Sequence, residues 1–92
     1  MIVSFADKDT AKLASLDRVR RFESIERPAL RKLTQLDVAL SLEDLKSPPG
    51  NRLEPLRGNR EGQYSIRIND QYRVCFVWTE NGPSGVEIID YH

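Results

Sequence analysis

The sequence has few of the residues from which disulfides and metal sites are built, with one cysteine, Cys75, and one histidine, His92. A single cysteine cannot form an internal disulfide, and a lone thiol suits a reducing cytoplasm. One cysteine and one histidine are too few for a zinc site of ordinary composition. Because Val74 and Phe76 flank Cys75, we expect a small buried hydrophobic residue there, and not a nucleophile.

Long hydrophobic runs and nucleotide-binding motifs are also missing. No apolar run approaches the roughly 20 residues that span a bilayer, and residues 1–5 resemble a strand more than a signal peptide. The sequence has no glycine-rich dinucleotide fingerprint and no P-loop. We therefore expect a cytoplasmic protein without metal or cofactor, whose chemistry would come from histidine, carboxylates, tyrosine and arginine.

The chain is short and electrically balanced. Its 92 residues, 39% of them hydrophobic and 30% charged, predict one globular domain spanning residues 1–92. Lysine plus arginine number 14, as do aspartate plus glutamate, so the net charge is zero. That balance argues against strong, indiscriminate affinity for free nucleic acid.

Positive charge is nevertheless concentrated in one segment. Residues 51–73 carry five arginines against three carboxylates, a net of +2, whereas residues 74–92 carry three carboxylates and no lysine or arginine. The five arginines are Arg52, Arg57, Arg60, Arg67 and Arg73. A local excess of positive charge is what a phosphate-binding site requires.

The first half of the chain is predicted to be helical. Asp7, Asp9 and Thr10 offer an N-cap and acidic first turn for a helix over residues 7–21. A second helix follows Pro28, with leucines recurring every three or four residues as far as Leu40. Residues 42–45 can add a turn before the Ser-Pro-Pro-Gly sequence at 47–50 stops it.

The second half is predicted to form strands. Residues 53–56 read as a brief or edge strand because they contain a proline. Apolar and polar residues then alternate over 64–68 and 72–78, with a tight reversal between them, and residues 86–91 form the last strand. The expected order is an N-terminal strand, two helices and an antiparallel meander of three to four strands (β-α-α-β-β-β-β), an α+β domain. Two helices covering one face of the sheet would leave the other face free for a site.

The C-terminal residues are the first candidates for chemistry. The imidazole of His92 has a reference pKa of about 6.5 and can both take and give protons near neutrality. Asp90 has the same strand parity and can orient it. Tyr91 has the opposite parity, and it either stacks on a base or completes the core.

The second candidate is the segment that contains Arg57 and Arg60, close after Glu54, together with Arg73 from a later strand. Three arginines that converge near one glycine turn make an anion site. Metal-free RNA cleavage through the ribose 2′-OH needs a base, cations beside the phosphorane and an acid for the 5′ oxygen. Glu54, Arg57, Arg73 and His92 would supply that set.

Three stretches together carry a family resemblance: Asn-Arg-Leu-Glu-Pro-Leu-Arg-Gly-Asn-Arg-Glu-Gly at 51–62, Tyr-Ser-Ile-Arg-Ile-Asn-Asp-Gln-Tyr-Arg at 64–73, and the terminal Asp-Tyr-His. Over essentially its whole length the chain resembles HigB/GraT-type toxins of the RelE/ParE superfamily. The resemblance implies a RelE-like fold and a ribosome-dependent endonuclease that cuts mRNA. It also implies neutralisation by a HigA-type helix-turn-helix antitoxin that represses the operon.

The resemblance also implies roles for individual residues. Family members use residues that match Arg57, Arg73, Asp90, Tyr91 and His92. Some relatives carry histidine where this chain has Glu54, so a two-histidine scheme cannot be transferred intact. We expect His92 to be the main proton-transfer group, Glu54 to help or act as base, and Arg57, Arg60 and Arg67 to bind phosphate.

Two other functions remain open. A ParE-like toxin has the same fold but poisons DNA gyrase and needs no histidine or acid at its C-terminus. A non-catalytic interaction protein would instead dock through a basic face made of Arg18, Arg20, Arg21 and Arg27. For an antitoxin, both the basic surface over residues 18–31 and an exposed sheet edge are candidate binding surfaces.

Overall fold

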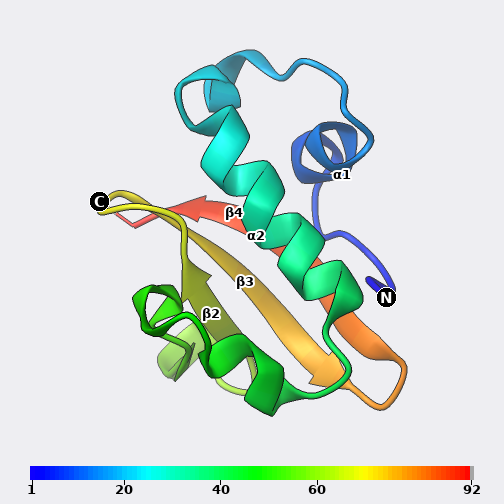
Figure 1. The fold of residues 1–92 in the computed structure, drawn as a ribbon, viewed down its shortest axis with the longest axis vertical. Helices are drawn as coiled ribbons and strands as arrows, with labels where there is room; N and C mark the ends of the chain where they lie inside the picture. The colour runs from blue at the N-terminus through cyan, green and yellow to red at the C-terminus, as the bar shows by residue number, and fades with distance from the viewer. Residues whose placement is uncertain (92) are drawn as a thin grey trace.

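The computed structural model of the chain describes residues 1–91; the candidate His92 lies outside the described residues. Figure 1 shows two helices lying across a curved sheet. The elements in order are α1 (Lys8–Ala14), η1 (Arg20–Ile25), α2 (Glu26–Val38), η2 (Leu42–Lys46), η3 (Pro49–Asn51), β1 (Glu54–Pro55), η4 (Gly58–Arg60), β2 (Tyr64–Arg67), β3 (Tyr72–Thr79) and β4 (Gly82–Asp90).

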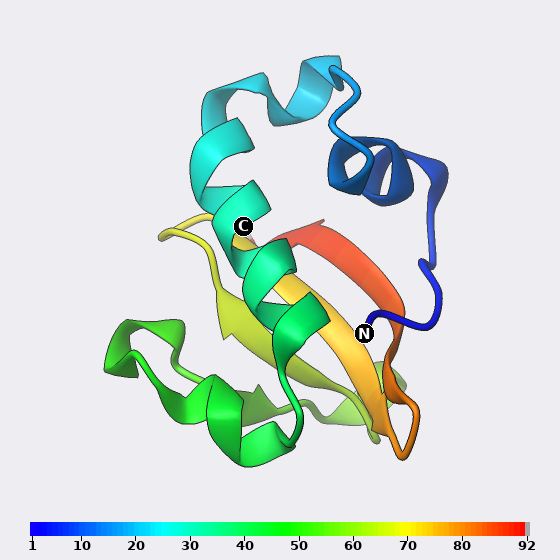
Figure 2. The same cartoon turned by 45° about the vertical axis from the view of Figure 1, so that its right-hand side comes forward.

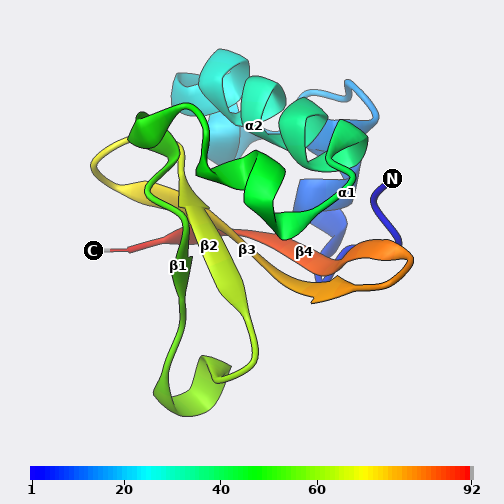
Figure 3. The same ribbon diagram turned by 60° about the horizontal axis from the view of Figure 1, so that its bottom comes forward.

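The sheet has four antiparallel strands in the order β1-β2-β3-β4. Figure 3 shows both helices on one side of the sheet, with the opposite side of the central strands uncovered. The predicted α+β class and the meander are confirmed. A register shift lies between Cys75 and Val77 in β3, and β4 begins at Gly82, four residues before the predicted start.

The predicted N-terminal strand is reduced to a single parallel bridge between Phe5 and Val86. Figure 2 shows this segment beside the first part of β4, where the Val3 amide donates to the Pro83 carbonyl and the Ala6 amide to that of Val86. Pairing stops there because the chain turns into α1 at Asp7, whose carboxylate accepts from the Thr10 amide as the predicted N-cap.

Both helices form, but their ends differ from the prediction. α1 ends at Ala14, well before residue 21, because Leu16 adopts a left-handed φ of 70°. α2 begins at Glu26, so Pro28 lies in the first turn, where its missing N–H costs no hydrogen bond. Leu40 lies beyond the end of α2 and is 91% exposed, whereas Leu45 in η2 is fully buried.

The core lies between the helices and the face of the sheet that they cover. Phe22 and Leu36 from the helical layer meet Val74, Phe76 and other apolar strand residues. Val74 and Phe76, two residues apart in β3, therefore share the face of the strand that points into the core. Tyr64, Tyr72 and Trp78 are partly buried against this core. Within residues 1–91, none of the helices is long and apolar enough to cross a membrane.

Candidate active site on the open face of the sheet

The open face carries two rows of side chains that the strand register aligns. One row pairs Glu54 with Ser65, Ser65 with Cys75, and Cys75 with Glu87. The adjacent row pairs Arg67 with Arg73, and Arg73 with Ile89. Because alternate residues of a strand point to opposite faces, the intervening residues Ile66 and Val74 belong to the core.

Arg73 is held firmly at the centre of this face. Its Nε donates to Ser65 Oγ at 2.8 Å and its Nη2 to the Arg52 carbonyl at 2.6 Å. Nη2 also lies 3.6 Å from Glu54 Oε1, and only 12% of the Arg73 side chain is exposed. These contacts fix the plane of the guanidinium, which suits recognition of a phosphate.

Beside Arg73 lies a polar hollow of about 330 Å³. It is lined by Arg52, Arg67, Asn69, Asp70, Arg73 and Tyr91. The Tyr91 ring lies 5.8 Å from the Arg73 guanidinium and the residue is 47% exposed. Arg67 forms an ion pair with Asp70. The structure thus brings together Arg67, Arg73 and Tyr91 as candidates, with Glu54 alongside.

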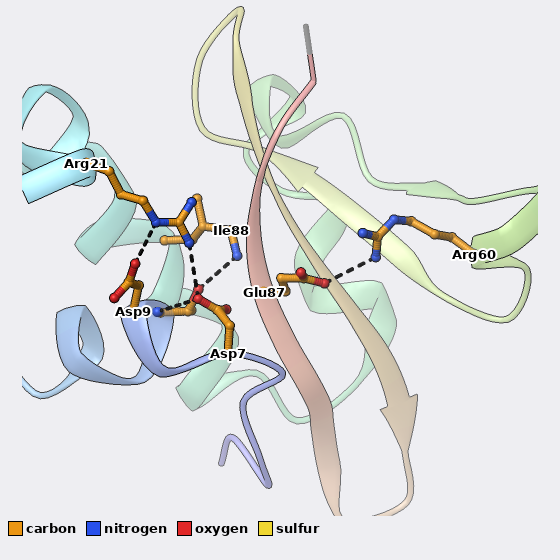
Figure 4. Close-up of polar contacts among 7 residues, drawn as sticks. Asp7, Asp9, Arg21, Arg60, Glu87 and Ile88 are labelled. Carbon is orange, nitrogen blue, oxygen red and sulfur yellow. Dashed lines mark hydrogen bonds and ion pairs between the residues drawn. The ribbon is translucent and has the colours of Figure 1, made fainter. Parts of the chain in front are cut away.

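The other two candidate arginines have different neighbours. Arg57 lines a separate hollow of about 500 Å³ between β1, η4 and β2. Arg60 Nη1 contacts Glu87 Oε1 at 3.3 Å and Gln63 Oε1 at 3.2 Å, and Figure 4 shows this ion pair. Arg57, Arg60 and Arg73, which were expected to converge near one glycine turn, therefore do not line one hollow.

Asp90 lies at the end of β4, opposite Tyr72 in the register. Its Oδ2 accepts from Gln71 Nε2 at 3.0 Å, and the Gln71 carbonyl accepts from the Tyr91 amide at 2.6 Å. The hairpin between β2 and β3 therefore holds the last described residues. Asp90 is the last residue of β4, and Tyr91, which follows it, lines the hollow beside Arg73.

Cys75 lies beneath the charged side chains of the open face and is fully buried, as expected. Burial raises the pKa of its thiol from 9.0 to about 11, an effect that Arg60 opposes and Glu87 reinforces. A thiol with a raised pKa is a poor nucleophile at neutral pH. Within residues 1–91, no group of three histidine, cysteine or carboxylate side chains is placed to hold a metal ion.

The predicted basic docking face is partly neutralised. Arg21 binds Asp7 and Asp9 at 3.2 and 2.7 Å, as Figure 4 shows. Arg18 lies 3.6 Å from Glu23 and 3.9 Å from Glu26. Two of its four arginines therefore have carboxylate partners within the chain.

Comparison with solved structures shows that other proteins share this fold. YafQ from Escherichia coli is similar with a TM-score of 0.66 and 15% identity, covering 99% of this chain and 92% of that one. A YoeB–YefM complex from Staphylococcus aureus contains a chain that is similar with a TM-score of 0.64 and 20% identity, covering 100% of this chain and 95% of that one.

Comparison of sequences shows the family to which the chain belongs. A model of the family described as "RelE-like toxin of type II toxin-antitoxin system HigB" matches residues 3–92. Toxin HigB-1 of Vibrio cholerae is 44% identical over 82 residues, covering 87% of this chain and 86% of that protein. The chain belongs to the HigB-like toxin family, and it is therefore a toxin of a type II toxin-antitoxin system whose partner is an antitoxin.

Proposed function

We propose that this toxin is a ribosome-dependent endoribonuclease that cleaves mRNA by metal-free attack of the ribose 2′-OH. The observation that carries the proposal is Arg73, a guanidinium fixed at the centre of the open face between Glu54 and the Tyr91 ring. A preorganised cation at this position stabilises the charge that develops on the phosphorane.

In the proposed reaction, a base removes the 2′ proton, the 2′ oxygen bonds to phosphorus, and the bond to the 5′ oxygen breaks. Glu54 is half-exposed and its carboxylate lies beside the Arg73 guanidinium, so it is the base or assists it. We assign His92 as the acid that protonates the leaving 5′ oxygen. Asp90 would orient that imidazole, and Tyr91 would stack on a base next to the cleaved bond.

The remaining candidates are proposed to bind the RNA strand away from the reactive phosphate. Arg67 lines the same hollow as Arg73, whereas Arg57 and Arg60 lie at the two ends of η4. A chain with zero net charge gains little from non-specific attraction to nucleic acid. Presentation of mRNA by the ribosome would compensate for the low affinity of the toxin for free RNA.

The antitoxin is proposed to be a HigA-type helix-turn-helix protein, and the complex a hetero-oligomer. The similar YoeB chain was solved in complex with YefM. We further propose that the toxin acts in the cytoplasm, where mRNA and ribosomes are found.

The decisive experiment is to induce the toxin alone in cells, follow growth and sequence the 5′ ends of cellular RNA. The parent should stop growth and create new ends within translated regions, whereas Arg73→Ala and His92→Gln should do neither and should still bind the antitoxin. Arg27→Gln, a change at an exposed position in α2, is the matched control and should remain toxic.

Two outcomes would contradict the proposal. Growth arrest without new RNA ends, accompanied by DNA damage, would indicate a gyrase poison. Full toxicity of both Arg73→Ala and His92→Gln would remove the assigned site.

A further inference from the structure

Arg52, which connects η3 to β1, has an unusual backbone conformation. Its φ of 46° and ψ of 54° are left-handed, a region that residues other than glycine rarely adopt. Single residues in this region are found where the surrounding structure enforces them, often at functional sites. The Arg52 amide also donates to the Pro49 carbonyl at 3.1 Å, which closes the preceding turn.

The neighbouring Asn51 holds Arg52 in this left-handed conformation. Asn51 is fully buried, and its side-chain amide donates to the carbonyls of Leu45 and Ser47 at 3.1 and 3.3 Å. Its Oδ1 accepts from Lys32 Nζ at 2.5 Å. A buried amide with partners on α2 and η2 anchors the chain, so the position of Arg52 is determined by the fold and not by loop flexibility.

The left-handed turn directs the two ends of Arg52 to the same site. Its carbonyl accepts from Arg73 Nη2, and its exposed side chain lines the hollow that Arg67, Arg73 and Tyr91 share. The residue therefore contributes a backbone acceptor that orients one guanidinium and a second guanidinium of its own.

The three arginines in the hollow differ in the partners of their side chains. Arg73 is bound by Ser65, Glu54 and the Arg52 carbonyl, and Arg67 is paired with Asp70. Within residues 1–91, the Arg52 guanidinium has no hydrogen-bond or ion-pair partner. Arg73 pairs with Glu54 and Arg67 with Asp70, so the positive charge of the hollow that no carboxylate of residues 1–91 balances is that of Arg52.

We propose that Arg52 binds a second RNA phosphate, adjacent to the one that Arg73 contacts. The ligand is a single-stranded RNA segment with at least two consecutive phosphodiesters, its bases facing Tyr91. The inference rests on the proposed RNA-cleaving function and extends it. It assigns a binding role to an arginine that the sequence marks only as part of a positively charged segment.

The test is direct binding of a fluorescent RNA pentanucleotide that carries 2′-O-methyl groups and cannot be cleaved. Fluorescence anisotropy would give the binding constant over a range of salt concentrations. A phosphate contact on a single strand contributes about 0.7 to the slope of log K against log salt. Arg52→Gln should lower the slope by about 0.7 and weaken binding, whereas Arg52→Lys should retain it and the control Arg27→Gln should match the parent.

A second oligonucleotide identifies the phosphate. In this RNA an uncharged methylphosphonate replaces the adjacent phosphate, and the parent should bind it as weakly as Arg52→Gln binds the unmodified RNA. Arg52→Gln should bind the modified RNA no more weakly than that, because both changes remove the same contact. Thermal unfolding monitored by circular dichroism verifies that Arg52→Gln is folded at the assay temperature. An unchanged slope in folded Arg52→Gln would overturn the inference, as would additive losses with the methylphosphonate.

Failure of the Arg52 site can be distinguished from failure of the proposed RNA-cleaving function. Absence of RNA binding by the parent at the lowest salt would overturn the second phosphate site, while RNA-end sequencing in cells still decides whether the toxin cuts mRNA. Conversely, a salt slope that depends on Arg52 in a toxin that leaves cellular RNA intact would retain the anion site and reject cleavage.

Discussion

The contact between Ser65 and Arg73 offers a quantitative test of how the site is held. Ser65→Ala removes the hydroxyl that accepts from Arg73 Nε at 2.8 Å and changes little else in volume. Ser65 is fully buried and Arg73 is 12% exposed, so water cannot readily replace the lost acceptor. A hydrogen bond to a charged group in such surroundings contributes about 1.5–3 kcal/mol.

A double-mutant cycle isolates this pair from the other contacts of Arg73. The four proteins are the parent, Ser65→Ala, Arg73→Met and the double variant, and urea unfolding followed by circular dichroism gives the free energy of unfolding of each. We expect a coupling energy of about 1.5–3 kcal/mol. The remaining contacts, with Glu54 and the Arg52 carbonyl, are lost equally in both variants that lack Arg73, so they cancel.

The matched control uses Ser84, a residue of β4 whose hydroxyl lies 3.0 Å from that of Ser4. A cycle between Ser84→Ala and Arg73→Met should be additive to within about 0.3–0.5 kcal/mol, because the two side chains share no hydrogen-bond partner within residues 1–91. A Ser65–Arg73 coupling inside that same range would refute the argument that the hydroxyl fixes the guanidinium.

Three further predictions concern single residues. The thiol of Cys75 has a pKa of about 11 in the folded protein, against 9.0 when unfolded. Unfolding between pH 9 and pH 11 therefore releases a proton, and the free energy of unfolding should fall by about 2–3 kcal/mol across this pH range. Urea titrations at several pH values should show a smaller fall for Cys75→Ala, and an equal fall would contradict the pKa. Thr10→Val removes the hydroxyl that accepts from the buried Ile88 amide, so urea unfolding should show a loss of about 1–3 kcal/mol; a change below about 0.5 kcal/mol would mean that water satisfies the amide. Glu54→Gln keeps the shape of the proposed base but cannot take a proton, so cleavage of ribosome-bound mRNA by the purified toxin should slow by about 10²–10⁴-fold, and an unchanged rate would exclude Glu54.

Much of the fold could be predicted because it depends on local rules. The Asp7 cap, the leucine spacing of the second helix and the strand over residues 72–78 each depend on a few neighbouring residues. The structure confirms all three except at Leu40, which lies beyond the end of α2. The end of α1 could not be predicted, because nothing in the local sequence requires Leu16 to adopt a left-handed conformation. The helix closes with local hydrogen bonds, in which the Leu16 amide donates to the Leu13 carbonyl and the Asp17 amide to the Lys12 carbonyl.

The candidate site was predictable in composition but not in arrangement. The excess of arginine in residues 51–73 indicated an anion site, yet the strand register decides that Arg67 and Arg73 are neighbours while Arg57 lines another hollow. Arg52 was missed as a binding residue because its position depends on the buried Asn51, which has partners 19 positions away along the chain. A signal was available in the Pro-Gly-Asn sequence before it, which is typical of a tight turn.

The two borders of the sheet also determine how this toxin can meet other proteins. Its outer strand β1 has only two residues, and Pro55 has no amide hydrogen to offer. Along β4, the Thr10 hydroxyl and the segment around Ser4 occupy amides on the free side. Few backbone groups at either edge are therefore free to pair with a strand of another molecule, which disfavours edge-to-edge aggregation of the toxin when no antitoxin is bound. We therefore expect an antitoxin to recognise side chains instead of adding a strand to the sheet.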